Sequence, residues 1–141
     1  MNSDSKTHIG VGLLTVSHRS VTGGFVYVEN LFNHLLPLAQ TRTYHFFLNL
    51  DNFRYFRKRW GTYGNAVFHI VDIRVDLLRN PLRAIRKLVA KARKDAAAEE
   101  AIIQSELRAT LSRAGITTLF FPASSIYPKG LTGMNILTTI F

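Results

Sequence analysis

Cysteine is absent from this chain of 141 residues, so disulfide bonds and thiolate metal ligands are excluded. Long hydrophobic runs are absent as well, because none approaches the ~20 apolar residues of a membrane-spanning helix. The polar start, MNSDSKTH, lacks the apolar stretch of a secretory signal peptide, and we predict residues 1–7 to be a flexible tail. These absences favour a cytoplasmic protein.

Acidic residues are scarce, because only nine Asp and Glu stand against 18 Lys and Arg, which leaves a net charge of +9. Most of the excess lies between positions 54 and 94, where only Asp72 and Asp76 oppose the basic side chains. The rest of the chain is close to neutral. One basic surface therefore carries the imbalance and can attract an anionic partner.

Apolar residues make up 47% of the chain, and many of them fall into short, nearly continuous runs. Such runs are typical of strands that are buried on both faces of a parallel sheet. Helical segments separate most of them, which indicates β-α-β units. We therefore predict an α/β, Rossmann-like three-layer domain over residues 8–141, with a mostly parallel sheet and a central first strand. The five predicted strands are residues 8–17, 43–50, 66–73, 116–121 and 135–141.

Three helical segments follow from apolar spacing and from start and stop signals. The first covers residues 24–39, and Pro37 is expected to end or kink it. The second, residues 52–60, is a short helix or turn. The third begins at Asn80, a good N-cap before proline, and runs to about residue 114 as one helix or as two.

The start of this third helix is amphipathic. Its apolar stripe comprises Leu82, Ile85, Val89, Ala92 and Ala96, and we expect the fold to depend on it. Basic residues take the opposite side, where two interpretations stay open: a surface for anionic lipid headgroups, or an ordinary solvated face. The basic residues proposed for this anion-binding surface are Arg83, Arg86, Lys87, Lys91 and Lys94.

The segment TVSHRSVTGGFVYVENL joins the first strand to the first helix through two glycines. Glycine lets a ligand approach the backbone closely, and the helix start offers free N–H groups and a positive dipole end. Thr22, Gly23 and Gly24 are therefore candidates for binding a phosphate or a sugar. A tight turn without a ligand is the alternative.

Three more side chains are expected at the same edge, beyond the carboxyl ends of the strands, where open sheets bind ligands. His18 contacts a ligand or is an exposed loop histidine. Ser124 and Ser125 bind a sugar hydroxyl or cap the local backbone. The histidines share no metal-ligand spacing, and no nucleophile elbow, Walker loop or dinucleotide fingerprint is present. We therefore expect no metal and no cofactor, and assign no catalytic residue.

Four phrases, VGLLTVS, TGGFVYVENL, LFFPASS and NILTTIF, occur in an order that resembles the N-terminal domain of family 4 glycosyltransferases, which have the two-domain GT-B fold. In that family a glycine loop leads into a helix with a tyrosine and a leucine, here Tyr27 and Leu31. A later strand ends in a proline, here Pro122. The next strand precedes a histidine whose position falls at or just past Phe141.

The resemblance implies the acceptor-binding part of a retaining glycosyltransferase, which moves a sugar from a nucleotide-sugar to a hydroxyl acceptor. In the family, the loop at Gly23 and Gly24 lies in the cleft between two domains, near the donor phosphates and the acceptor. The second domain, which holds most of the nucleotide-sugar site, is not in this sequence, so we expect a truncated chain that is inactive alone. The acceptor is a sugar or a lipid-linked sugar, and the protein is cytoplasmic or peripheral at the inner membrane face.

Two other classes of function remain open. A non-catalytic α/β module of flavodoxin-like layout would bind a nucleotide or a flavin at the same edge. A basic nucleic-acid-binding domain would use the charged surface, although the sequence contains no recognition-helix or stacking-aromatic motif. The residues therefore favour the glycosyltransferase interpretation over nucleic-acid binding.

Overall fold

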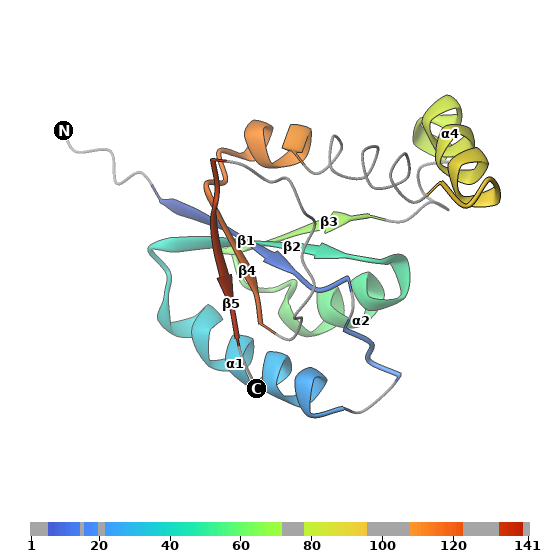
Figure 1. Ribbon diagram of the computed structural model, residues 1–141. Helices are drawn as coiled ribbons and strands as arrows, with labels where there is room; N and C mark the ends of the chain where they lie inside the picture. Colours follow the sequence, from blue (N-terminus) through green and yellow to red (C-terminus); the bar gives the residue numbers. More distant parts are fainter. Residues whose placement is uncertain are drawn as a thin grey trace.

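In the computed structural model, the described residues are 6–14, 16–19, 22–71, 78–95, 108–122 and 133–139. Their strands form one parallel sheet in the order β3-β2-β1-β4-β5, with β1 in the centre (Figure 1). This confirms the predicted α/β, Rossmann-like fold and the central first strand. The strands are β1 (Thr7–Gly12), β2 (Arg42–Leu48), β3 (Ala66–Ile70), β4 (Thr118–Phe121) and β5 (Asn135–Thr138).

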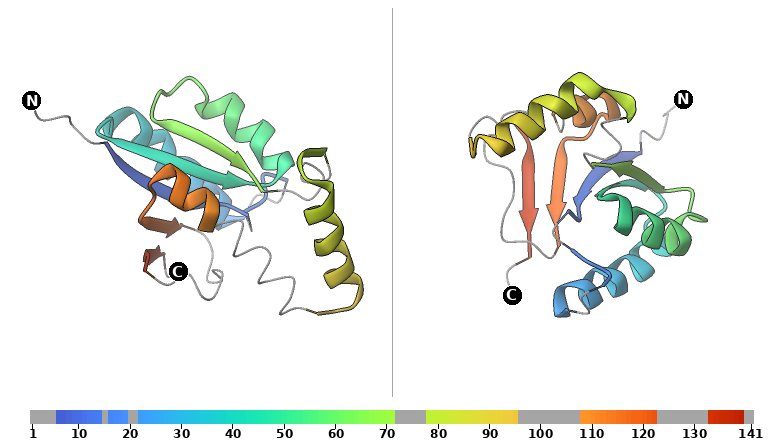
Figure 2. Two further views of the ribbon diagram at one scale, coloured as in Figure 1. Left: turned by 90° about the horizontal axis from the view of Figure 1, so that it is seen from above. Right: turned by 90° about the vertical axis from the view of Figure 1, so that its right-hand side faces the viewer.

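Helices lie on both sides of this sheet and give the predicted three layers. Helices α1 (Gly23–Leu38) and α2 (Leu50–Trp60) cover one face. Helix α4 (Pro81–Ala92) and a short helix over residues 108–114 lie on the opposite side (Figures 1 and 2). The helix after β1 and the helix after β2 therefore share one face, and both begin at the carboxyl edge of the sheet.

Alternate residues of each strand point to opposite faces, so the sheet builds two hydrophobic clusters. The larger one, beneath α1 and α2, is rich in aromatic rings that are fully buried, among them Phe32, Phe46, Phe56 and Trp60. The smaller one lies on the other face and joins the strands to residues 108–114. Its buried members are Phe47, Leu111, Ile116, Leu119 and Phe121.

Strand β1 ends earlier than the sequence predicts. The apolar run extends to residue 17, but the ladder stops at Gly12, and Leu13 adds one last bond from its N–H to the carbonyl of Phe47 (3.1 Å). A turn then bonds the N–H of Val16 to the carbonyl of Leu13 (3.4 Å). The apolar run continues past Gly12 for a different reason: Leu13 and Val16 pack in the larger cluster beneath the first two helices.

Helix α1 continues through Pro37 and ends one residue later, at Leu38. Proline has no N–H to bond the carbonyl four residues back, and its ring crowds that carbonyl, so a helix seldom runs far past it. The cap residue Ala39 then donates its N–H to the carbonyl of Leu35 at 2.8 Å. The third helical stretch starts as predicted, with Asn80 accepting from the N–H of Arg83 at 3.4 Å.

The same stretch is not one helix in the described residues. Helix α4 ends at Ala92, and Lys94 takes a positive φ of 53°, which a helix interior does not accommodate. Residues 96–107 lie outside the described part. The helix over 108–114 closes at Gly115, whose φ of 67° is the left-handed cap conformation expected there.

The predicted orientation of α4 is wrong. Leu82, Ile85 and Val89, expected to support the fold, are exposed to solvent, whereas Lys87, expected on the anion-binding surface, is only 7% exposed. The helix turns its side with Ala84 and Ala90 inward, and small side chains permit a close approach. The long aliphatic stem of a lysine can fill such a contact. Among the described helices, none is long and apolar enough to cross a bilayer.

Candidate functional site

The loop after β1 and the start of α1 lie at the carboxyl edge of the sheet, as the sequence predicts. Thr22 is the N-cap of α1, and its Oγ1 accepts a hydrogen bond from the N–H of Phe25 at 3.4 Å. Gly23 opens the helix, and a Cβ placed on it meets no heavy atom within 4 Å. Space is therefore open beside Gly23 at the positive dipole end of α1, where Thr22 already accepts from the amide of Phe25.

His18 is held in this loop by Asn52, at the start of α2. The backbone N–H and the ring nitrogen Nδ1 of His18 both lie within hydrogen-bond distance of Asn52 Oδ1, at 3.3 Å and 2.9 Å. The other end of the amide, Nδ2, donates to the carbonyl of Val16, so the orientation of the amide is determined. Because Oδ1 only accepts, Nδ1 of His18 carries a proton, and in the neutral ring Nε2 is an acceptor.

The ring of His18 also stacks on Tyr55, with the ring centroids 5.0 Å apart. The hydroxyl of Tyr55 donates to Glu29 of α1 at 2.5 Å, and Arg59 pairs with the same carboxylate at 2.7 Å. Desolvation, reinforced by the hydrogen bond to Glu29, raises the pKa of Tyr55 above its usual value of 10.0. The network thus joins the loop, α1 and α2, and it fixes the imidazole on one side.

Asn52, Tyr55 and Glu29 are not among the residues that the sequence predicts for this site. One sequence signal points to this helix start, because Asn49 precedes Asn52 by three residues. This is the spacing between an N-cap residue and the residue whose backbone N–H donates to it. Asn49 Oδ1 does accept from the N–H of Asn52 at 2.9 Å. The spacing locates the helix start but does not reveal that the side chain of Asn52 turns back to the preceding loop. Ser124 and Ser125, also proposed for this edge, lie outside the described residues.

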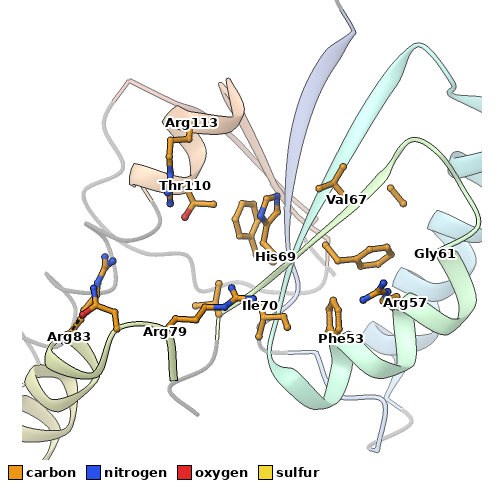
Figure 3. Close-up of a pocket in the computed structure, with 15 residues that line it drawn as sticks. Phe53, Arg57, Gly61, Val67, His69, Ile70, Arg79, Arg83, Thr110 and Arg113 are labelled. Atoms are coloured by element: carbon orange, nitrogen blue, oxygen red, sulfur yellow. Dashed lines mark hydrogen bonds between the residues drawn. The ribbon is translucent and has the colours of Figure 1, made fainter. Parts of the chain in front are cut away.

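A pocket of about 870 Å³ lies along β3, the edge strand of the sheet (Figure 3). Phe53 and Arg57 of α2 line one part of it. His69 of β3 and Arg113 of residues 108–114 line another, and Arg83 of α4 lies at the far side. Of the basic residues proposed for an anion-binding surface, only Arg83 belongs to this pocket. Arg86, Lys91 and Lys94 are exposed, and Lys87 is buried.

Three histidines form a row across β1, β2 and β3 on the face of the smaller cluster. His45 Nε2 lies 2.9 Å from His8 Nδ1, and His45 Nδ1 lies 2.9 Å from His69 Nε2. Burial, with His69 and His8 as neighbours, lowers the pKa of His45 from 6.5 to about 4. Burial and Arg113 also lower the pKa of His69. Sequence spacing could not reveal this row, because it arises from strand register.

The part of the chain that the structure describes contains no group of three or more His, Cys, Asp or Glu placed to hold a metal ion. In the histidine row, both nitrogens of His45 already face other imidazoles, so they bond within the protein. No protein family model, curated protein or solved structure matches this chain. The chemistry of the carboxyl-edge loop is therefore the basis for assigning a function.

Proposed function

We propose that this chain is the acceptor-side Rossmann-like domain of a retaining glycosyltransferase with GT-B architecture. The reaction moves a sugar from a nucleotide-sugar to a hydroxyl group of a sugar or a lipid-linked acceptor. A second domain supplies most of the nucleotide-sugar site, and this chain forms the opposite wall of the cleft. A lipid-linked acceptor stays in the bilayer, so a peripheral position on an anionic membrane belongs to the same proposal.

The observation that carries the proposal is an oriented imidazole in the loop that leads from β1 to the start of α1. Asn52 accepts from Nδ1 of His18, which makes Nε2 the acceptor of the neutral ring, and such an acceptor can receive a hydrogen bond from a sugar hydroxyl. In the same segment, the space beside Gly23 is open at the start of α1, where an anionic group is stabilised. Both features occur at the end of the sheet where open α/β folds bind ligands.

In this arrangement the residues of this chain bind the acceptor and orient it. The bond to Asn52 and the stack on Tyr55 restrain the imidazole of His18 from two directions. Restrained groups lose less conformational entropy when a ligand binds, which strengthens the contact with the acceptor. The chain is therefore a binding partner in sugar transfer, and turnover requires the second domain.

Two alternatives use the same surfaces. A nucleotide- or flavin-binding module would place its phosphate at the same start of α1, because the helix dipole does not distinguish between phosphate carriers. A nucleic-acid-binding domain would use the exposed residues Arg86, Lys91 and Lys94 instead. The oriented imidazole favours a ligand with hydroxyl groups over a ligand bound through phosphate alone.

The test is a titration of the ¹⁵N-labelled chain, followed through the amides of Gly23 and Gly24 and the imidazole of His18. The probes are simple glucosides and mannosides, UDP-, GDP- and ADP-glucose, flavin mononucleotide and a DNA duplex. We expect the sugars to shift these signals, with weak affinity, and no sugar transfer by the chain alone. Tighter binding of the flavin or of a free nucleotide at these positions would establish the binding-module alternative.

Two glycine variants make this test specific. Gly23→Val fills open space, so the fold should persist while the ligand loses its approach to α1. Gly64→Val is the matched control, because Gly64 lies in the turn before β3 and its Cβ would also meet nothing within 4 Å. We expect only the first variant to weaken sugar binding. Equal binding by both, sugar transfer by the chain alone, or shifts confined to the DNA titration, would contradict the proposal.

A further inference from the structure

Helix α4 turns its large aliphatic side chains to solvent. Leu82 is 73% exposed, Ile85 50%, Leu88 43% and Val89 42%, and Leu78, just before the helix, is 87% exposed. These five are more than half of the nine large hydrophobic residues that are exposed in the described part of the chain. Such a concentration on one element is unusual for a surface where hydrophobic residues normally lie singly.

The exposed aliphatic residues form one continuous face. At 100° per residue, the four that belong to α4 fall within an arc of about 120°. The buried residues of the helix, Ala84, Lys87 and Ala90, are centred almost opposite this arc. Helix α4 lies at the periphery of the molecule, where its outer side is accessible (Figures 1 and 2).

Basic residues border the aliphatic face on both sides. Arg86 and Arg93 lie next to Leu82 on the helical wheel, and Lys91 lies beyond Leu88 at the other border; all three are exposed. From residue 78 to residue 94 the sequence contains no Asp or Glu. The surface therefore combines an apolar centre with cationic margins and has no anionic group on the helix.

We propose that α4 lies in the plane of an anionic lipid bilayer, with its aliphatic face inserted at the boundary between headgroups and acyl chains. The aliphatic side chains then leave water, and the flanking cations reach the headgroups. Each basic residue near an anionic surface adds electrostatic attraction, which salt screens. A DNA duplex offers phosphates for the margins but no apolar region for the centre, so the bilayer fits the whole surface better.

This inference rests on the proposed function for its purpose, because a chain that acts on a lipid-linked acceptor has to reach the bilayer. The surface itself is independent of sugar transfer, and vesicle binding is measured without any sugar. Vesicle binding can therefore fail while sugar binding at His18 succeeds, and the reverse is equally possible.

The experiment is co-sedimentation of the full chain with vesicles of phosphatidylcholine alone and of phosphatidylcholine with phosphatidylglycerol, at low and high salt. We expect binding to the anionic vesicles, with a fraction that persists at high salt because the inserted aliphatic face is not screened. The apolar variant, Leu82→Asn/Ile85→Asn/Val89→Asn, should bind at least tenfold more weakly. Its control is Leu38→Asn, which replaces a leucine on α1 that is 81% exposed.

A second pair of variants separates charge from insertion. Arg86→Glu/Lys91→Glu/Arg93→Glu should weaken binding at low salt at least tenfold and leave the aliphatic face intact. Arg42→Glu/Arg54→Glu/Lys58→Glu makes the same change of net charge away from α4, on exposed positions, and should retain most of the binding. All variants are checked for native circular dichroism, and none replaces a buried residue.

Three results would overturn the proposal. The first is equal binding of the apolar variant and the wild type at both salt concentrations, which would mean that charge alone attracts the vesicles. The second is a folded chain that sediments with DNA but not with anionic vesicles. The third is a wild-type dimer that the apolar variant loses, without vesicle binding, which would mean that a second copy covers α4.

Discussion

His18 and Asn52 are 34 residues apart in the chain, yet one side-chain atom of Asn52 receives both the backbone N–H and the ring nitrogen Nδ1 of His18. Asn52 is almost completely buried, and its amide nitrogen bonds the carbonyl of Val16 in the same loop. The first turn of α2 thereby holds Val16 and His18 in the connection that follows β1. It also sets which nitrogen of the imidazole accepts a hydrogen bond.

Removal of the side-chain amide of Asn52 should destabilise the fold and release the imidazole of His18. We expect Asn52→Ala to lower the free energy of unfolding by about 1–3 kcal/mol, because it leaves the Val16 carbonyl and the donors of His18 without their partner. Urea denaturation measures this change, and ¹⁵N spectra of the imidazole should show a mixture of tautomers. Asn30→Ala, at an exposed position of α1, is the control and should change stability by less than about 0.5 kcal/mol. An unchanged tautomer in Asn52→Ala would contradict the role given to Asn52.

Gly12 is required where β1 passes beneath the ring of Phe121. A Cβ on Gly12 would lie 2.6 Å from Cδ1 of that ring, which is buried in the smaller cluster. We expect Gly12→Ala to cost about 1–3 kcal/mol of stability, the usual penalty for overpacking. Gly23→Ala is the control, because its Cβ meets nothing within 4 Å and should change the free energy of unfolding by less than about 0.5 kcal/mol. Equal denaturation midpoints for the two variants would argue against this packing.

Stability should fall on acidification because of the histidine row. The pKa of His45 is lowered from 6.5 to about 4, so the unfolded chain takes up a proton at a higher pH than the folded protein. The contribution of neutral His45 to the free energy of unfolding is fully present above pH 6.5. It decreases as the pH falls below that value and is lost below about pH 4. A shift of this size corresponds to about 3 kcal/mol. The lowered pKa of His69 acts in the same direction.

Denaturation midpoints between pH 8 and pH 4.5 test this expectation. His45→Gln removes the central imidazole and keeps polar atoms for its neighbours, so its stability should depend less steeply on pH than that of the wild type. His34→Gln, at an exposed position of α1, should keep the wild-type slope. The groups that face His45 are His8 on β1 and His69 on β3, and Arg113 faces His69. Parallel pH profiles for wild type and His45→Gln would assign the acid sensitivity to other residues.

Glu29 should control the ionisation of Tyr55. Its hydrogen bond and its charge both raise the pKa of Tyr55, after desolvation as the largest cause. We expect Glu29→Gln to lower that pKa, because desolvation then acts without Glu29 while Arg59 still favours the phenolate. The ion pair with Arg59 is also lost, which costs about 1 kcal/mol because the Arg59 side chain is 45% exposed and solvent screens the pair. Phenolate absorbance during alkaline titration, with Tyr55→Phe to assign the signal, would show no difference if Glu29 had no influence.

The sequence by itself determined the order and the type of the main elements. Near-continuous apolar runs located the strands at β1, β2 and β3, because a parallel sheet covered on both faces buries both sides of each strand. Cap signals located the start of α4 at Asn80 and the glycine turn at Gly115, because these depend on neighbouring residues alone. The glycine loop at Gly23 was located in the same way, as a local strand-to-helix transition.

Only the tertiary structure decided which way α4 faces and which residues meet across the fold. Periodicity finds an apolar stripe but does not tell whether its partner is the protein core, so Leu82 and Ile85 were expected to support the fold and instead face solvent. Asn52 reaches His18, and His45 reaches His8 and His69, through contacts between elements distant in the chain. Strand register and helix packing create such contacts, and neither leaves a local pattern in the sequence.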